Sequence, residues 1–264
     1  MTEDFRKVTE KASGNWGVVA QFVDEDKPFF DVNSSQRFYA ASLAKVPIAM
    51  AVMKLIKDGQ AELSEELELD KAVKMPGTGV LNLLHNGLKI SLQDALNTMM
   101  AQSDNTAAKL LVKKFGVSAI NEFLSSIGMK ITQLEPQPDG KFHYGDTTPS
   151  ETATLLRGLY TGQFLGNADS QMILEIMKHC HLNWGIERYL PSTMPDGKTK
   201  LEVSNKEGTW EDNRHEVALV WAQRPYVLCV LSSGLSDQRY HVDNVGVLTI
   251  AQISKLIYET THAA

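Results

Sequence analysis

The stretch Ser42-Leu43-Ala44-Lys45 opens a segment in which apolar residues recur at the period of an α-helix. We expect this helix to span residues 40–58, because the following Gly59 is of a residue type that commonly ends helices. A lysine that follows a serine by three positions lies one turn along on the same helical face. The stretch therefore predicts a hydroxyl and an amine side by side near the start of a helix.

The two ends of the chain carry strand patterns instead. A short helix is expected at residues 3–12, and residues 16–23 and 29–32 form a hairpin pattern around a short polar turn. The last third predicts strands at residues 201–209, 217–222 and 226–232, followed by a helix at residues 242–260. Strands from both ends of the chain should therefore meet in one sheet.

Helical patterns dominate the middle of the chain. Ser91 and Asp94 form a near capping box, and Thr148-Pro149 is typical of a helix start. Three more helices are expected at residues 105–115, 117–127 and 166–179, each next to a glycine or a capping residue.

This order predicts an α/β (α+β) fold, in which an antiparallel five-stranded sheet is flanked by helices and an all-helical lobe is inserted. We expect an α/β sheet domain made of residues 1–40 and 165–264. An all-helical domain should comprise residues 41–164, with the active site at the junction.

Composition and charge indicate which binding partners and which cellular surroundings the chain is suited to. The chain has 264 residues, 43% of them hydrophobic, and a net charge of −6, without the basic runs that nucleic-acid binding requires. It lacks an apolar stretch of about 18 residues, so we expect no membrane span. The first residues lack a signal-peptide pattern, which favours a cytoplasmic protein, or an exported one if a leader was removed. A monomer is expected.

The chain has two cysteines, Cys180 and Cys229, which we interpret as buried thiols rather than as a disulfide framework. His179-Cys180-His181 suggests a metal site at first sight. Zinc sites need three or four ligands at characteristic spacings, and the partner ligands are missing. We therefore expect neither a metal nor an organic cofactor.

Ser42 and Lys45 have the chemistry of a nucleophile and its base. A serine hydroxyl attacks effectively only when a neighbouring group removes its proton, and a buried lysine can be neutral enough to do so. The flanking residues 39–41 and 46–47 are largely apolar. Backbone N–H groups at a helix start also favour an oxyanion. The alternative is a solvated serine and lysine on an amphipathic helix.

Ser103-Asp104-Asn105 lies between two predicted helices. The Ser103 hydroxyl could relay a proton to a leaving group, and the Asn105 amide could bind a substrate carbonyl. The alternative is an ordinary N-cap for the helix that follows, since all three residue types are good caps.

Lys206-Glu207-Gly208-Thr209 lies on a predicted strand. Lys206 would supply positive charge, the Thr209 N–H could complete an oxyanion hole, and Gly208 would let a substrate backbone approach closely. The alternative is a strand end with a solvated charge pair.

Together these residues resemble the serine β-lactamase and penicillin-binding protein superfamily, nearest the class A β-lactamases, which carry S-x-x-K, S-D-N and K-T-G. The resemblance covers nearly the whole chain. Its supporting stretches are residues 38–42, 58–60, 90–96, 102–107 and 146–149.

The resemblance implies a β-lactamase/transpeptidase-like fold and an acyl-enzyme formed on Ser42 from a small acyl substrate, namely a β-lactam, a peptide or an ester. It implies that Lys45 and Ser103 handle the protons. The oxyanion would be bound by the N–H groups of Ser42 and Thr209. The substrate would be positioned by Asn105, Lys206 and Gly208.

Two departures from class A bear on activity. Glu207 stands where the family has a hydroxyl that helps to bind a substrate carboxylate, and its charge would oppose an anionic β-lactam by about 1 kcal/mol or more. Positive charge could be restored by Arg214, His215 or Arg239. The loop that carries the family's deacylating glutamate corresponds to residues 134–140, which lack its Leu-Asn pair. Glu135 is the candidate deacylation base, with an ordinary loop carboxylate as the alternative.

We therefore expect a serine hydrolase that forms an acyl-enzyme on an amide or ester, similar to class A β-lactamases but weak on β-lactams. The alternative is a penicillin-binding or sensing protein that acylates but scarcely deacylates. A catalytically inactive relative is a third reading, which the presence of all the site residues opposes.

Overall fold

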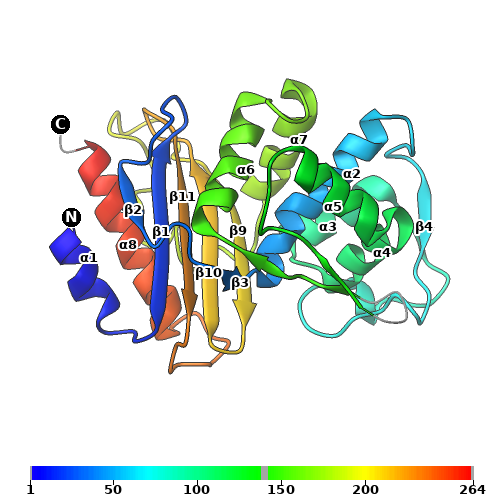
Figure 1. Ribbon diagram of the computed structural model, residues 1–264, viewed down its shortest axis with the longest axis horizontal. Helices are drawn as coiled ribbons and strands as arrows, with labels where there is room; N and C mark the ends of the chain where they lie inside the picture. Colours follow the sequence, from blue (N-terminus) through cyan, green and yellow to red (C-terminus); the bar gives the residue numbers. More distant parts are fainter. Residues whose placement is uncertain (1, 138–141, 263–264) are drawn as a thin grey trace.

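The computed structural model describes residues 2–137 and 142–262, and its main sheet lies between layers of helices (Figure 1). The sheet has five antiparallel strands in the order β2-β1-β11-β10-β9. Their bounds are β1 Asn15–Phe22, β2 Phe30–Val32, β9 Val203–Trp210, β10 Asn213–Val220 and β11 Tyr226–Ser233. Because β1 pairs with β11, strands from the two ends of the chain are adjacent, as predicted.

The helices form layers on both faces of this sheet (Figure 1). Their bounds are α1 Thr2–Thr9, α2 Lys45–Lys57, α3 Leu92–Ala101, α4 Asn105–Phe115, α5 Val117–Ser126, α6 Pro149–Thr161, α7 Asn167–Lys178 and α8 Val245–His262. Alternate residues of β11 join different cores, since Cys229 packs with α6 residues and Val230 packs with α8 residues. The sheet is therefore buried on both faces.

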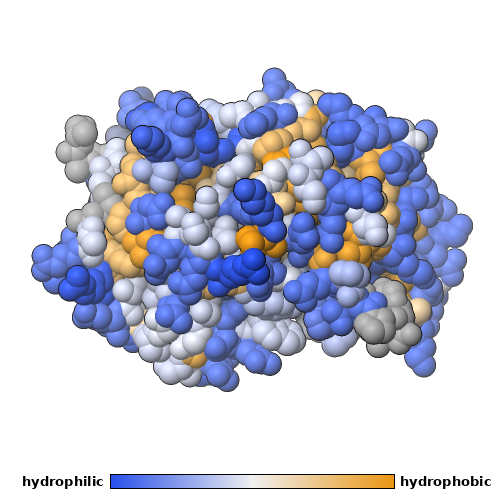
Figure 2. Space-filling view, viewed as in Figure 1, coloured by the Kyte–Doolittle hydropathy of each residue, from blue (hydrophilic) through white to orange (hydrophobic). Residues whose placement is uncertain are grey.

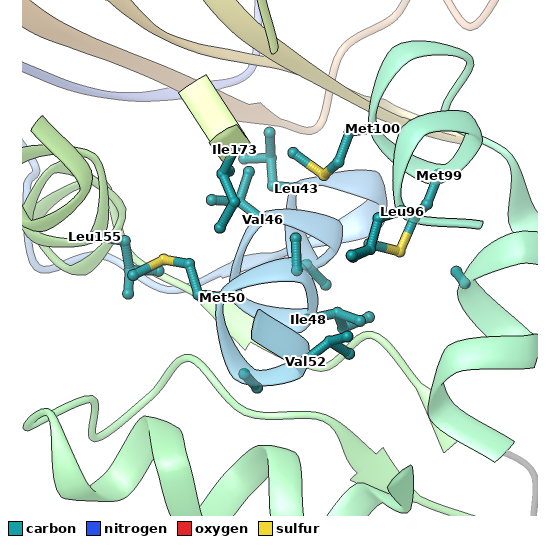
Figure 3. Packing of buried hydrophobic residues seen from close by; sticks show 14 of the residues in the cluster. Leu43, Val46, Ile48, Met50, Val52, Leu96, Met99, Met100, Leu155 and Ile173 are labelled. Carbon is teal, nitrogen blue, oxygen red and sulfur yellow. The ribbon is translucent and has the colours of Figure 1, made fainter. Parts of the chain in front are cut away.

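Helix α2 lies at the centre of the larger core (Figure 3). Apolar side chains from α3, α6 and α7 surround it, so it is buried on nearly all sides over its first nine residues, Lys45–Met53. A helix that is apolar all round belongs in a protein interior. This position buries the start of α2 within the core.

The predicted helix at residues 40–58 begins differently from the expectation. Residues Ala41–Ala44 form a 3₁₀ turn, and the α-helix starts only at Lys45. Pro47 is the third residue of α2, where its missing N–H costs no helical hydrogen bond. Ser42 therefore lies in a tight turn directly before the helix.

Capping residues place several helices where they were predicted. Ser91 and Asp94 form a complete capping box at the start of α3, and Thr148 caps α6 through the Glu151 N–H. Helix α4 has the predicted bounds, with Asp104 as its N-cap. The alternative interpretation of the Ser103-Asp104-Asn105 segment as a cap is thus correct for Asp104.

Strand β10 was predicted at residues 217–222 but spans Asn213–Val220. The error has a physical reason, because Arg214, His215 and Glu216 are polar residues that are nevertheless buried in the strand. Several short strand pairs were also not predicted. They are β3 Phe38–Tyr39 with β8 Asp146–Thr147, β4 Glu66–Glu68 with β5 Lys89–Ser91, and β6 Glu135–Pro136 with β7 Phe142–His143.

The division into a sheet domain and a helical domain stays a proposal. Helix α6, which the predicted boundaries assign to the helical domain, packs against β1, β10 and β11. The face of the molecule in Figure 2 is largely hydrophilic, with small hydrophobic patches. Among the described residues, no helix combines the length and the apolar character needed to cross a bilayer.

Candidate active site

A cavity of about 750 Å³ lies where the 3₁₀ turn at Ala41–Ala44 meets strand β9. Its walls come from the turn, from β9, and from loops around residues 75–78, 143–144 and 238–240. The lining residues include Ser42, Asn105 and Thr209, which belong to three separate motifs of the sequence. The fold thus brings these distant segments to one cavity.

Ser42 and Lys45 are adjacent at the base of this cavity. The Lys45 Nζ lies 2.9 Å from the Ser42 Oγ, and Ser42 is 9% exposed while Lys45 is fully buried. The interpretation as a solvated pair on a surface helix is therefore wrong. The hydroxyl reaches the cavity, and the amine behind it is shielded from water.

The environment of Lys45 favours its neutral form. Burial, followed by the nearby charge of Lys206, lowers the pKa of Lys45 well below its usual value. Its Nζ also lies 2.6 Å from the Ser103 carbonyl oxygen and 2.7 Å from the Asn105 Oδ1. Hydrogen bonds to these two acceptors orient the amine toward Ser42.

Ser103 connects the two lysines. Its Oγ lies 3.1 Å from the Lys45 Nζ and 2.9 Å from the Lys206 Nζ, and all three side chains are buried. The four groups of Ser42, Lys45, Ser103 and Lys206 form a continuous chain of hydrogen bonds. Such a chain can carry a proton between the nucleophile and a leaving group.

The loops around this chain are fixed by Asp104 and Asn105. The Asp104 carboxylate accepts the N–H groups of Val80 and Leu81 and also caps α4 at Ala107. The Asn105 Nδ2 donates to a loop carbonyl, that of Pro76, at 2.9 Å. The amide of Asn105 is therefore held between Lys45 and the cavity wall.

Backbone strain is concentrated next to the reactive groups. Ala41 has φ 46° and Ser103 has φ 52°, which are left-handed conformations that non-glycine residues rarely adopt. Each costs on the order of 1 kcal/mol and persists only where the surroundings enforce it. These two conformations occur directly at the segments that carry the Ser42 and Ser103 hydroxyls.

Lys206 and Glu207 form a buried ion pair rather than a solvated one. The Lys206 Nζ lies 3.0 Å from the Glu207 Oε1, and the Glu207 side chain is only 12% exposed. Burial by itself would raise the pKa of Glu207, but Lys206 and a hydrogen bond from Ser103 outweigh it and lower the pKa. Glu207 is thus an ionised carboxylate on the cavity wall.

Gly208 has a different neighbour from the one expected. A Cβ on Gly208 would lie 3.0 Å from the Leu43 Cγ and 3.2 Å from the Ala40 carbonyl oxygen. It would therefore face the protein's own turn, and Gly208 is not among the residues that line the cavity. The glycine allows β9 to approach the turn that holds Ser42, which corrects the prediction that it faces substrate. Thr209 does line the cavity.

The structure places Glu135 outside the lining of the cavity. It is exposed on the short strand β6, opposite His143, and it is not a lining residue of the cavity. Its charge acts on Tyr39, whose pKa is raised by burial and then by Glu135. Residues 138–140 of the predicted loop lie outside the described residues.

The three side chains predicted to restore positive charge near Glu207 differ in their surroundings. His215 is neutral, because burial lowers its pKa to about 4, and its Nε2 donates to the Tyr39 carbonyl oxygen at 2.9 Å. Arg239 pairs with Asp237 at 2.8 Å. Arg214 lines the cavity, where burial lowers its pKa. Of the three predicted charges, only Arg214 faces the cavity as a cation.

Aromatic residues of the site were missed by the sequence analysis. The cavity is lined by Tyr39, Tyr144, Trp210 and Tyr240. The Tyr144 ring lies 5.6 Å from the Lys45 Nζ, and burial raises the pKa of its hydroxyl far above the usual range. No sequence signal separates these rings from core aromatics, because their positions depend on loops.

Cys180 and Cys229 are both free and buried, as expected. Burial raises the pKa of Cys180 to about 11, so its thiol is protonated. Across residues 2–137 and 142–262, no three His, Cys, Asp or Glu side chains are grouped as metal ligands.

Comparisons with known proteins cover most of the chain. A family model described as the beta-lactamase enzyme family matches residues 1–261. Beta-lactamase BRO-1 of Moraxella catarrhalis is 24% identical over 235 residues, which cover 85% of this chain and 73% of that protein. Beta-lactamase CARB-4 of Pseudomonas aeruginosa is 29% identical over 213 residues, covering 76% and 71%.

Solved structures share the fold across the chain. A beta-lactamase from Sphaerobacter thermophilus superposes with a TM-score of 0.87 at 25% identity, covering 100% of this chain and 97% of that one. A mutant of PBP-A, solved as an acyl-enzyme complex with penicillin G, has a TM-score of 0.84 at 22% identity and covers 100% and 96%. The second likeness concerns the fold alone.

Proposed function

Because the chain belongs to the beta-lactamase enzyme family, we propose that it is a serine hydrolase that cleaves an amide or ester through an acyl-enzyme on Ser42. The observation that carries this proposal is the buried chain of hydrogen bonds from Ser42 through Lys45 and Ser103 to Lys206. It gives a cavity-facing hydroxyl both a base and a path for its proton.

The geometry supports a two-step reaction. The Ser42 Oγ attacks the acyl carbonyl as its proton passes to the Lys45 Nζ, and the resulting oxyanion is bound by the N–H groups of Ser42 and Thr209. The tetrahedral intermediate collapses when the leaving group takes a proton by way of Ser103. Water then adds to the acyl carbonyl, which releases the acid and restores the Ser42 hydroxyl.

Other residues position the substrate. Asn105 is held so that its amide lies at the cavity wall, and Lys206 places a positive charge behind Ser103. We propose these steps without a metal or an organic cofactor. The partner is therefore a small acyl compound that fits the cavity.

Covalent labelling tests this function. We expect a fluorophosphonate or a labelled penicillin to leave one adduct on Ser42, located by peptide mass spectrometry. Ser42→Ala should carry no adduct, whereas Ser64→Ala, at an exposed serine, should label as the wild type does. Absence of both adducts on folded wild-type protein would contradict the proposal.

The position of Glu135 favours a second candidate, a penicillin-binding or sensing protein that deacylates very slowly. Hydrolysis of the acyl-enzyme needs a base within hydrogen-bond reach of the attacking water. Glu135 is exposed on β6 and does not line the cavity that contains Ser42. An acyl-enzyme formed from penicillin would then persist.

Burst kinetics separate the two candidates. With a chromogenic β-lactam we expect a rapid colour change equivalent to about one substrate molecule per enzyme molecule. A much slower steady-state rate should follow, and it reports deacylation. Since Glu135 does not line the cavity, Glu135→Gln should change the steady-state rate less than about threefold. A loss of a hundredfold or more in this variant, with an unchanged burst, would instead identify Glu135 as the deacylation base.

A further inference from the structure

The charges on the wall of the cavity are mainly negative. Two carboxylates, Glu207 and Glu211, line it, and Arg214 is the lining residue that carries a fixed positive charge. Glu211 is exposed at the turn after β9, where water screens its charge. Glu207 is nearly buried and pairs with Lys206, but Glu207 lines the cavity and Lys206 does not, so this ion pair turns its negative end toward the cavity.

The cationic side chains near the cavity are already engaged. The Lys206 Nζ lies within 3.0 Å of the Glu207 carboxylate and within 2.8 Å of the Glu207 carbonyl oxygen, so its charge is balanced inside the protein. The Arg214 guanidinium donates to backbone carbonyls of Trp210, Glu211, Asn213 and Arg239. Arg214 is therefore the cationic lining residue that an incoming carboxylate would meet, and backbone carbonyls already hold its guanidinium.

The remaining wall suits uncharged or cationic groups. Tyr39 and Trp210 lie edge to face, with ring centroids 6.2 Å apart, and Trp210 is 55% exposed. Tyr240, on the opposite loop, is 54% exposed. Aromatic faces bind apolar groups and attract cations, and they offer no stabilisation to an anion.

We propose that Glu207 selects substrates by charge, so that the preferred acyl substrates carry an uncharged or cationic group where a β-lactam carries its carboxylate. This inference rests on the proposed acyl transfer at Ser42 and names its substrate class. Glu207 is placed for this role because its carboxylate lines the cavity and accepts a hydrogen bond from Lys206. Any group near the leaving-group side of the substrate lies close to that negative charge.

Three matched esters test the proposal on the whole protein. They are phenylacetylglycine esters of phenol, of m-carboxyphenol and of m-(trimethylammonio)phenol, with each kcat/KM divided by the rate of alkaline hydrolysis of the same ester. We expect the wild type to disfavour the carboxylate ester by about tenfold relative to the neutral ester. In Glu207→Gln the ratio of carboxylate to neutral ester should rise by about tenfold.

The ratio of carboxylate to neutral ester is taken within one variant. Any general loss of activity from the altered hydrogen bonds affects both esters and therefore cancels. Glu211→Gln is the matched control, and its ratio should change less than about twofold because solvent screens that carboxylate. Glu207→Thr serves as a second variant should Glu207→Gln not fold. In the wild type, raising the salt concentration should weaken the discrimination between the carboxylate ester and the neutral ester.

Two outcomes would overturn the inference while leaving the proposed function intact. One is acylation of the wild type with a preference for the carboxylate ester. The other is a ratio that neither Glu207 variant nor salt alters. Failure of all three esters to acylate Ser42 would instead refute the proposed function, and the inference with it.

Discussion

Replacing Lys45 by methionine is expected to reduce the rate of acylation of Ser42 by about a thousandfold or more, the upper range for loss of a general base. The Lys45 Nζ is the basic group within hydrogen-bond distance of the Ser42 Oγ, at 2.9 Å. Methionine fills a similar volume in the buried site but cannot accept a proton. Stopped-flow measurement of phenol release from a neutral aryl ester gives the rate.

The pH dependence of the wild type should identify the same group. A base must be unprotonated, so acylation should rise with pH through the pKa of Lys45 and then level off. Because burial and Lys206 lower that pKa well below 10.5, the plateau should begin well below the pH at which a solvated lysine titrates. In Lys45→Met the residual rate should lack this rise.

Two variants test whether Lys45 acts as a base or only as a positive charge. Lys45→Arg retains the positive charge but does not lose its proton in proteins, so it should be as slow as Lys45→Met. Lys54→Met, on the same helix but part-exposed, should keep the wild-type rate. Circular dichroism confirms folding of each variant. Acylation of folded Lys45→Met at the wild-type rate would contradict the assignment.

Local signals in the sequence were sufficient for most of the helices and for the sheet. The capping box at Ser91 and the bounds of α4 depend on nearby residues, and such signals are readable from sequence. Strand β10 was misjudged because its polar residues are stabilised from a distance. Glu216, for example, accepts hydrogen bonds from Asn205 and from the Gly185 N–H, and burial raises its pKa to about 8.

The candidate site was predictable as a set of residues but not as a geometry. No spacing rule brings residues 42, 103 and 206 together, and only the family resemblance suggested that they meet. The direction in which Gly208 faces follows from the packing of β9 on the turn at Leu43. Glu135 lies on β6, whose pairing with β7 involves too few residues to show a pattern in the sequence.

Replacing Ser103 by alanine is expected to slow acylation by amides and β-lactams by about a hundredfold to a thousandfold, but by aryl esters less than about tenfold. An amine leaving group must gain a proton before the carbon–nitrogen bond breaks, whereas a phenolate leaves without one. The Ser103 Oγ is the group that joins the Lys45 Nζ, at 3.1 Å, to the Lys206 Nζ, at 2.9 Å.

The two substrate classes separate a proton relay from a structural effect. Ser103 has φ 52°, so alanine retains the same backbone strain and differs only by the hydroxyl. A collapse of the site would slow amides and aryl esters equally, because both need Ser42 and Lys45 in place. Penicillin labelling and aryl-ester burst rates, measured on one preparation of Ser103→Ala, give the comparison. Equal losses would mean that Ser103 holds the two amines apart rather than delivering a proton, and the leaving group would then have to be protonated directly by Lys45.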